Sequence, residues 1–339
     1  MAYNHFAMPD PELDPLLKAI GPQPSDVLKD LKAFRKGFEH FADAQRTAFS
    51  SQLRAAEAAL VAQDHTIAAE DGSFTVRSYY PSEPKDGVFP LLVWTHCGGM
   101  IVGGVETDDP FCHLLSHELQ MTIVNVNYRL APEHPFPTPL NDSYAALKWS
   151  VLNANLLHAD LSRGIISGGA SAGGALAAAQ VHRAQSDPFF AAHNTKISGL
   201  FLQVPMLCQP SDIPEDLKAN VTSFDQCAEA PMLSTALHKE GCALTGAKND
   251  DPEFAPLLNT SFEGLPPTHI QAAGIDPLRD TGLAYAERLR AAGVPTKAIG
   301  YQGATHAFHY AFPETALARK WEREARDGLR WLMEQAKTP

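Results

Sequence analysis

The sequence predicts an α/β fold with a mostly parallel central sheet and helices on both faces of that sheet. Short apolar segments typical of buried strands alternate with helical segments, and this alternation favours parallel strands joined by helical crossovers. The predicted strands cover residues 74–80, 89–95, 122–128, 165–168, 196–204, 268–273 and 296–301. The predicted helices cover residues 110–120, 139–154, 172–186, 278–292 and 314–336.

Composition and charge exclude several classes of protein. The chain has 339 residues, 45% of them hydrophobic, so it can bury a large core. A net charge of −12 argues against a nucleic-acid partner, because a polyanion attracts basic surfaces. The five cysteines are widely spaced, without a C-x-x-C pair, and predict neither a disulfide framework nor a structural zinc site.

The first residues and the hydropathy pattern bear on location. Residues 1–11 lack the basic start and apolar run of a secretory signal, and no segment approaches 18 consecutive apolar residues. We therefore expect a cytoplasmic location and no transmembrane segment. A homodimer is compatible with the sequence, which does not determine the oligomeric state.

Two regions depart from the alternating pattern. Residues 1–24 are rich in proline and acid and are expected to be irregular, whereas residues 24–60 have helical periodicity. Their apolar face belongs either to the core or to a lid over a pocket; it comprises Leu28, Leu31, Phe34, Phe38 and Phe41. The second departure covers residues 207–255, which contain no clean strand and are interpreted as a cap insertion. The predicted organisation is a helical cap segment over 1–60, core over 61–206, cap insertion over 207–255 and core over 256–339.

The candidate nucleophile is Ser171, in the pattern G-x-S-x-G formed by residues 169–173. An apolar β-favouring segment precedes it and small helix-favouring residues follow, which is the strand–turn–helix context of the nucleophile elbow in α/β-hydrolases. Such a turn holds the serine in a strained conformation with its hydroxyl accessible. A plain strand–helix turn is the alternative, so the assignment depends on finding a base, an acid and an oxyanion site.

An acid and a base follow the serine in the order that α/β-hydrolases use. Asp276 follows a predicted strand and precedes a helix, which places it at the carboxyl end of the sheet, where ligands of such sheets bind. Asp280 is its rival, but it falls inside the next helix. His306 also follows a strand and is the candidate base, whereas His309 is expected to pack or to face solvent.

A candidate oxyanion hole precedes the serine. The strand over 89–95 leads into His96-Cys97-Gly98-Gly99, which corresponds to the H-G-G-G loop whose backbone N–H groups stabilise a tetrahedral intermediate. We expect the N–H groups of Gly98 and Gly99 to face the oxyanion, together with that of Ala172, which follows the nucleophile.

From about residue 70 onward the chain resembles the hormone-sensitive-lipase-like esterases, also called bacterial family IV esterases. The resemblance is carried by His96-Cys97-Gly98-Gly99, the run Y-R-L-A-P-E-H-P-F-P over residues 128–137, Ser171-Ala172-Gly173-Gly174, Asp276-Pro277-Leu278-Arg279-Asp280 and His306-Ala307-Phe308. It implies an α/β-hydrolase core with a helical cap, a Ser-His-Asp triad and hydrolysis of short- to medium-chain acyl esters without a metal or organic cofactor. Arg129 and Glu133 belong to the shared run and are expected to be structural.

Two residues depart from the family pattern. Cys97 stands at the first glycine position of the oxyanion loop, and Ala170 stands where an acidic residue or threonine usually precedes the serine. Cys97 is either a buried small residue or a thiol that lines the pocket, and Met100 and Phe308 are further candidates for the pocket lining. A metal site at His113 and His117 is not favoured, because pairs at this spacing usually lie on a helix surface.

These residues favour a serine carboxylesterase acting on a small-molecule ester. The alternatives keep the scaffold but change the chemistry: the same triad could act on a lactone, an arylformamide or a pathway intermediate. A small-molecule receptor on the same scaffold is a non-enzymatic alternative, which the presence of His306 disfavours.

Overall fold

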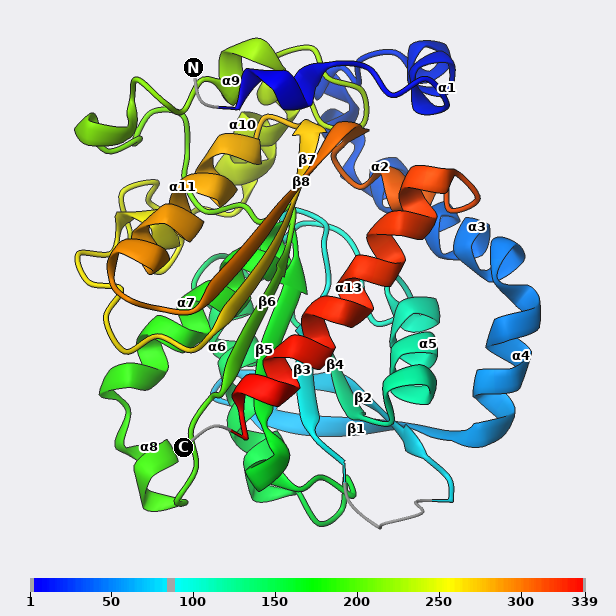
Figure 1. Ribbon diagram of the computed structural model, residues 1–339, viewed down its shortest axis with the longest axis vertical. Helices are drawn as coiled ribbons and strands as arrows, with labels where there is room; N and C mark the ends of the chain where they lie inside the picture. The colour runs from blue at the N-terminus through cyan, green and yellow to red at the C-terminus, as the bar shows by residue number, and fades with distance from the viewer. Residues whose placement is uncertain (1–2, 84–88, 338–339) are drawn as a thin grey trace.

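An eight-stranded sheet organises the chain in the computed structural model, which describes residues 3–83 and 89–337 (Figure 1). The strands are β1 (Leu60–Ala69), β2 (Gly72–Pro81), β3 (Leu91–Thr95), β4 (Thr122–Asn127), β5 (Ile165–Ala170), β6 (Gly199–Gln203), β7 (Thr268–Ile275) and β8 (Thr296–Thr305). Their order is β1-β2-β4-β3-β5-β6-β7-β8. The pairs β1/β2 and β2/β4 are antiparallel and all other pairs are parallel. The predicted mostly parallel sheet is confirmed.

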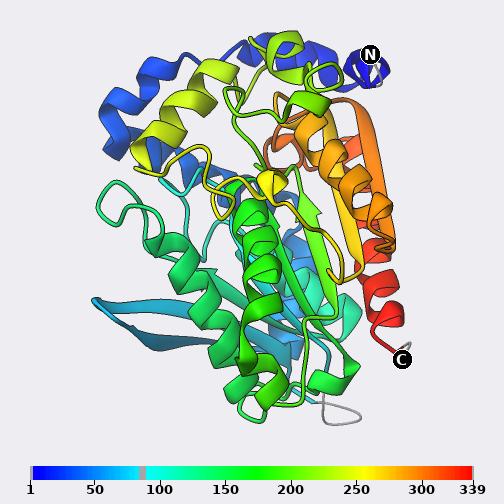
Figure 2. The same cartoon turned by 90° about the vertical axis from the view of Figure 1, so that its left-hand side faces the viewer.

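Helices cover both faces of the sheet (Figures 1 and 2). Those on one face are α6 (Thr138–Leu152), α7 (Ala172–Ser186) and α11 (Arg279–Ala291), and those on the other are α5 (Asp109–Leu119) and α13 (Ala316–Gln335). Strand β3 shows why two separate cores form. Its residues Leu91 and Val93 face the first layer, whereas Leu92 and Trp94 face the second, as the side-chain alternation of a strand requires.

The N-terminal region differs from the sequence prediction. Residues 1–24 were expected to be irregular, but the described part contains a 3₁₀ turn (Asn4–Ala7) and helix α1 (Leu13–Ile20). Leu13 and Leu17 are buried against the end of the sheet, which explains why this polar, proline-rich segment is ordered. The expected long helix over 24–60 is instead divided into a 3₁₀ turn (Ser25–Asp30), α2 (Leu31–Phe38), α3 (His40–Ala48) and α4 (Ser50–Ala59).

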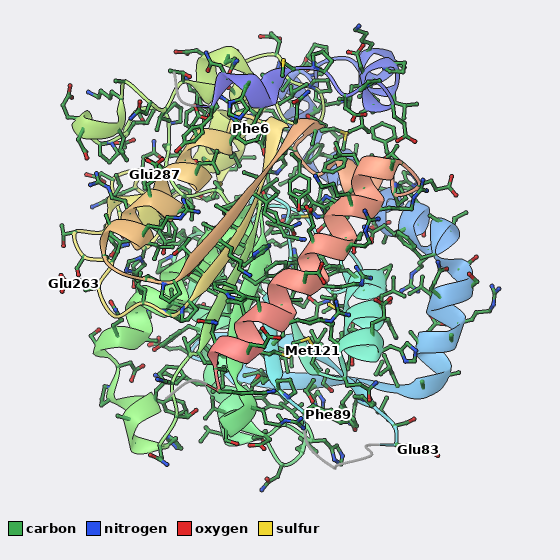
Figure 3. All side chains as sticks on the ribbon, viewed as in Figure 1. Phe6, Glu83, Phe89, Met121, Glu263 and Glu287 are labelled. Carbon is green, nitrogen blue, oxygen red and sulfur yellow. The ribbon has the colours of Figure 1, made fainter. Side chains whose placement is uncertain are left out.

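Glycines in β7 and β8 let the N-terminal segment lie directly on the sheet. A Cβ atom on Gly300 would fall 2.3 Å from the ring of Phe6, and one on Gly274 would fall 2.1 Å from the Phe6 carbonyl oxygen (Figure 3). Gly303, three residues before the candidate base, is likewise in contact with Asp10. The segment therefore packs against the strands that lead to Asp276 and His306.

A second irregular region lies over the carboxyl ends of the strands. It contains a 3₁₀ turn (Glu215–Leu217) and the helices α9 (Ser223–Gln226) and α10 (Thr235–Leu244). Helix α10 contacts the 3₁₀ turn Ser25–Asp30, so the two regions meet above the sheet (Figure 2). We call residues 25–41 and 231–244 the roof. The domain boundaries given above remain a prediction.

The remaining short helical elements of the described residues include a 3₁₀ turn at Leu161–Arg163, α8 (Pro188–Ala192) and a 3₁₀ turn at Pro256–Leu258. Helix α12 (Phe308–Ala311) begins just after His306. None of the helices described between residues 3 and 337 has the length and apolar character needed to cross a lipid bilayer.

Candidate active site

Ser171 lies at the sharp turn between β5 and α7. Its backbone angles, φ +54° and ψ −117°, are strained for a residue with a side chain. The turn is tight because strand and helix almost touch: a Cβ atom on Gly169 would fall 2.3 Å from the Gly173 carbonyl oxygen, and one on Gly173 would fall 2.0 Å from the Thr95 carbonyl oxygen. Both glycines of the motif are thus required by the packing. Ala170 is completely buried beside them.

Two further residues form a hydrogen-bonded chain with Ser171. His306 Nε2 lies 2.9 Å from Ser171 Oγ, and His306 Nδ1 lies 2.8 Å from Asp276 Oδ2. Asp276 directly follows β7 and His306 directly follows β8, so adjacent parallel strands bring acid and base together. Asp276 is fully buried and its second oxygen accepts the Leu278 N–H at 2.9 Å. This arrangement can take a proton from a serine hydroxyl and stabilise the imidazolium that results.

The two rival residues have other partners. Asp280 accepts the N–H groups of Thr222 and Ser223 at 2.8 and 2.9 Å, and the guanidinium of Arg279 at 2.7 Å. It therefore anchors the start of α9 to α11. His309 is buried and stacks on Trp321 with ring centroids 4.8 Å apart.

The oxyanion loop has a backbone that only glycine adopts readily. Gly98 has φ +119° and Gly99 has φ +64°, and a Cβ atom on Gly98 would fall 2.1 Å from the Val102 carbonyl oxygen. None of the backbone hydrogen bonds formed outside helices and strands by the described residues uses the N–H groups of Gly98, Gly99 or Ala172. The three N–H groups therefore remain candidate donors to an oxyanion.

Thr95 connects the oxyanion loop to the nucleophile turn, and the sequence analysis did not identify it. It is the last residue of β3, and its Oγ1 lies 3.0 Å from the Gly168 carbonyl oxygen and 2.7 Å from that of Gly173. A threonine at the end of a buried strand, directly before the H-C-G-G run, was the available signal. His96 is also held firmly: its ring stacks on Tyr128 with centroids 4.1 Å apart, and the Tyr128 hydroxyl donates to the His96 carbonyl at 2.8 Å.

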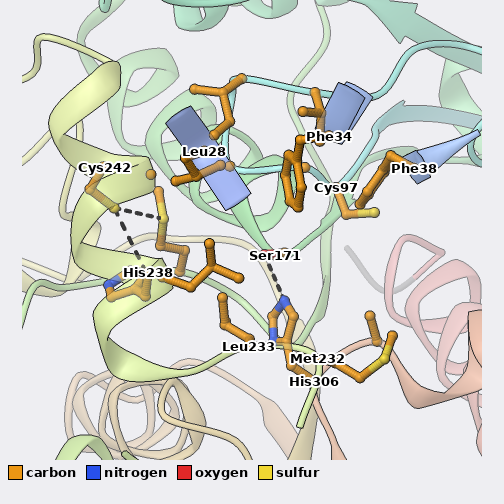
Figure 4. Close-up of a pocket in the computed structure, with 18 of the residues that line it drawn as sticks. Leu28, Phe34, Phe38, Cys97, Ser171, Met232, Leu233, His238, Cys242 and His306 are labelled. Carbon is orange, nitrogen blue, oxygen red and sulfur yellow. Dashed lines mark hydrogen bonds between the residues drawn. The ribbon is translucent and has the colours of Figure 1, made fainter. Parts of the chain in front are cut away.

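A cavity opens above Ser171 and His306, with about 730 Å³ of empty space including the part open to solvent (Figure 4). Its lining is almost entirely apolar and comes from the oxyanion loop, the roof and neighbouring segments. The lining residues include Leu28, Phe34, Phe38, Phe41, Ile101, Val102, Met206, Met232, Leu233, Leu237 and Leu278. The predicted apolar face of residues 28–41 thus contributes three phenylalanines to a pocket. Several lining residues from 206–244 were not identified from the sequence, because their spacing follows no single periodicity.

Of the three predicted lining residues, only Cys97 lies in the cavity wall. Met100 is fully buried in the core and has a φ of +63°. Phe308 is fully buried against Trp321, with ring centroids 5.5 Å apart. The structure therefore places Met100 and Phe308 in the supporting core instead of the pocket.

One polar side chain was missed in the cavity wall. Apart from Ser171 and His306, His238 of α10 is the only lining side chain with nitrogen or oxygen among the described residues. Burial, assisted by repulsion from His306, lowers the pKa of His238 to about 4, so its ring is neutral at pH 7. The roof therefore adds no charge to the site.

Arg129 and Glu133 both make ion pairs outside the cavity. Arg129 binds Asp142 with two nitrogens, each 2.8 Å from a carboxylate oxygen. Glu133 pairs with Arg35 of α2 at 2.7 Å, and Arg35 also donates to the carbonyl oxygens of Ile101 and Ala131 at 2.8 and 2.9 Å. Arg35, which the sequence analysis did not single out, thus ties the roof to the segment that follows the oxyanion loop.

The candidate metal ligands have ordinary partners. His113 lies 3.3 Å from Asp109 and packs edge-on against Tyr79. Among the residues that the structure describes, no group of three or more histidine, cysteine, aspartate or glutamate side chains could hold a metal ion.

Comparison with known families places this geometry in context. The sequence profile of a family with the α/β-hydrolase fold matches residues 92–310. The chain therefore belongs to this α/β-hydrolase family, and its resemblance to the hormone-sensitive-lipase-like esterases is confirmed.

Individual relatives extend the comparison beyond the matched range. The chain is 36% identical to carboxylesterase NlhH of Mycobacterium tuberculosis, over 67% of this chain and 70% of the relative. It is 30% identical to an AB hydrolase superfamily protein of Schizosaccharomyces pombe, over 81% of this chain and 80% of that protein. Among solved structures, vibralactone cyclase aligns with 98% of this chain and 97% of its own, with a TM-score of 0.92 and 36% identity.

Proposed function

We propose that this protein is a serine carboxylesterase that hydrolyses short- to medium-chain acyl esters. The proposal rests above all on the hydrogen-bonded chain from Ser171 through His306 to Asp276 at the base of an open apolar cavity. Membership of a family with named carboxylesterases supports ester hydrolysis as the reaction class.

In acylation, Ser171 Oγ attacks the ester carbonyl while His306 Nε2 takes the hydroxyl proton. The carbonyl oxygen becomes an oxyanion, which the N–H groups of Gly98, Gly99 and Ala172 stabilise. Asp276 accepts the Nδ1–H of His306, fixes its tautomer and stabilises its charged form. The proton then passes from His306 to the leaving alcohol, and an acyl group remains on Ser171.

In deacylation, His306 removes a proton from water, which attacks the acyl carbonyl. The same three N–H groups stabilise the second tetrahedral intermediate. His306 returns the proton to Ser171 Oγ, and the carboxylic acid leaves. No metal or organic cofactor enters these steps.

The cavity supports the substrate class. Its phenylalanine and leucine side chains favour hydrocarbon groups over charged ones. We therefore expect p-nitrophenyl butyrate and hexanoate to be better substrates than p-nitrophenyl palmitate.

Replacement of the nucleophile tests the proposal. Ser171→Ala removes one oxygen from a small side chain, so the fold should survive while hydrolysis of these esters is lost. The release of p-nitrophenol and the circular dichroism spectrum are measured together. A folded variant that retains wild-type turnover would refute the proposal, and binding without turnover by the wild-type protein would favour the receptor alternative.

A second candidate function is lactone chemistry with the same residues. The match to vibralactone cyclase over nearly the whole chain favours it, as does an apolar wall that leaves little polar surface to hold water. In this reaction a hydroxyl of the substrate replaces water in deacylation. Its oxygen bonds to the acyl carbon, the bond to Ser171 Oγ breaks, and the hydroxyl proton passes through His306 to Ser171.

Product analysis separates the two candidates. With ethyl 6-hydroxyhexanoate as the substrate, an esterase yields 6-hydroxyhexanoic acid, whereas intramolecular transfer yields the cyclic ester. Chromatography of the products formed within the first few per cent of conversion, with Ser171→Ala as the blank, distinguishes them.

A further inference from the structure

Two adjacent buried carboxylates lie at the start of α5: Asp108 precedes the helix and Asp109 is its first residue. Their surroundings differ. Asp109 accepts the Tyr79 hydroxyl at 2.8 Å and pairs with Arg77 at 3.0 Å and with Arg46. Burial alone would raise the pKa of Asp109, but its hydrogen bonds and the nearby cations outweigh burial and hold that pKa well below its usual range. Asp109 is therefore part of an ion-pair cluster on the side of the sheet.

Asp108 is fully buried and has only neutral donors. Its Oδ1 accepts the Tyr310 hydroxyl at 2.6 Å, and its Oδ2 accepts the Trp94 indole N–H at 2.8 Å. Among the described residues it forms no ion pair, and burial raises its pKa to about 6. A buried carboxylate without a cation is costly. The proposed reaction steps do not use this group.

The two donors lie next to the two loops that must cooperate during catalysis. Trp94 lies in β3, two residues before the oxyanion loop His96–Gly99. Tyr310 lies in α12, four residues after His306, and its N–H bonds to the Ala307 carbonyl at 3.1 Å. One carboxylate thus joins the strand that enters the oxyanion loop to the turn that carries the base.

Cys97 brings the oxyanion loop itself into this cluster. Cys97 and Tyr310 belong to the same buried cluster, and burial, followed by the proximity of Asp108, raises the pKa of the Cys97 thiol well above its usual range. The thiol is therefore neutral and packs between the cavity and Tyr310. A glycine at this position would lack that contact.

We propose that Asp108 is a positioning residue that fixes the oxyanion loop relative to His306. The inference rests on the proposed esterase function, because the distance between oxyanion donors and base matters only if both act on one substrate. A misplacement of about 1 Å between reacting groups can cost on the order of 10²-fold in rate. Loss of the Asp108 link should therefore lower kcat while changing KM little.

Three variants of the link distinguish positioning from simple packing. Asp108→Leu removes both hydrogen bonds at similar volume, and Tyr310→Phe removes one while keeping the ring. Asp108→Asn is the conservative variant: its carbonyl can accept from Trp94 while its NH₂ donates to the Tyr310 oxygen. Tyr285→Phe is the matched control, a buried tyrosine on α11 whose hydroxyl lies 3.1 Å from His182 Nε2.

The measurement is kcat and KM for p-nitrophenyl butyrate per active site, with sites counted from the final extent of fluorophosphonate labelling. We expect kcat to fall about 10- to 100-fold in Asp108→Leu and about 10-fold in Tyr310→Phe, with KM within threefold. Asp108→Asn should recover most of the loss, and Tyr285→Phe should stay within twofold. The double variant Asp108→Leu/Tyr310→Phe should lose no more than the worse single variant, because both break one link.

Several results would overturn the inference. If Tyr310→Phe keeps kcat per labelled site within twofold of wild type, the link is structural only, even where the melting temperature falls. A rise in KM alone, or losses that add fully in the double variant, would contradict it as well. If Asp108→Leu does not fold, Tyr310→Phe and Asp108→Asn still decide. Failure of the wild-type protein to turn over any ester would instead refute the proposed function.

Discussion

The base of the cavity and its roof are built by different means. At the base, Ser171, His306 and the oxyanion loop follow the ends of parallel strands and are held by backbone contacts too tight for a side chain at Gly98 or Gly173. The roof consists of short helices whose phenylalanine and leucine side chains meet the cavity, and Arg35 is a polar tie between it and the core.

This difference suggests a division of roles, in which the base of the cavity performs the proposed chemistry and the roof determines substrate selectivity. In the proposed reaction, the atoms that must be placed within a fraction of an ångström lie at the ends of the sheet strands, whereas the rest of the substrate would meet the helices of the roof. Substitutions at the base should therefore change kcat by orders of magnitude. Substitutions in the roof should change KM and the preference among chain lengths by smaller factors.

The largest expected effect distinguishes two aspartates at the base. Asp276→Asn should reduce kcat by up to about 10⁴-fold, because the amide stabilises the wrong tautomer of His306. Asp280→Asn is the matched control and should do much less, since Asp280 bonds to Thr222, Ser223 and Arg279. Steady-state hydrolysis of p-nitrophenyl butyrate measures both. A reversed order of the two effects would show that the acid has been assigned wrongly.

A smaller loss is expected at the oxyanion loop. Gly98→Pro deletes one backbone donor and imposes a negative φ where the chain has +119°, so its activity should fall by about 10²- to 10³-fold. The missing donor alone accounts for about 2.7–4 kcal/mol of transition-state stabilisation. The rate of hydrolysis and the melting temperature are measured together. An active Gly98→Pro enzyme would mean that the oxyanion is bound elsewhere.

The contact between the roof and the core can be weakened at Arg35. Arg35→Met keeps the aliphatic stem but loses the bonds to Glu133, Ile101 and Ala131. We expect KM to rise about threefold to tenfold and the preference for hexanoate over acetate esters to weaken, with kcat much less affected. Lys36→Met, exposed on the same helix, is the control. A tenfold fall in kcat without a change in KM would contradict the division of roles.

The smallest effect is expected at Cys97. Cys97→Gly keeps the N–H groups of Gly98 and Gly99, so activity should stay within about tenfold of wild type. Because the thiol lines the cavity, a small alkylating reagent should inhibit the wild-type enzyme slowly, and the glycine variant should resist it. Equal inhibition of both proteins would place the sensitive thiol elsewhere.

Much of the base of the cavity could be predicted from the sequence because its signals are local. The G-x-S-x-G pattern, the glycines after a buried strand, and an acid and a histidine each following a strand all reflect backbone constraints on neighbouring residues. The parallel sheet then brings these strand ends to one edge. The structure accordingly brings Ser171, His306 and Asp276 into hydrogen-bonding distance.

The roof and the N-terminal region were harder to predict because their signals are not local. Residues 1–24 look irregular until Phe6 meets the glycines of β7 and β8, a contact between positions almost 300 residues apart. Strand β1 was missed because its mixed burial gives no clean alternation. The pocket assignment of Met100 and Phe308 rests on their nearness to motif residues, whereas both side chains lie in the core.

The central claim is that Ser171 performs the chemistry, and covalent trapping tests it most directly. The protein is incubated with a fluorophosphonate ester, digested and analysed by peptide mass spectrometry. The account predicts one phosphonyl group per wild-type chain, on the peptide that contains Ser171, and none on Ser171→Ala. Labelling of another serine, or an equal extent of labelling in Ser171→Ala, would contradict the account.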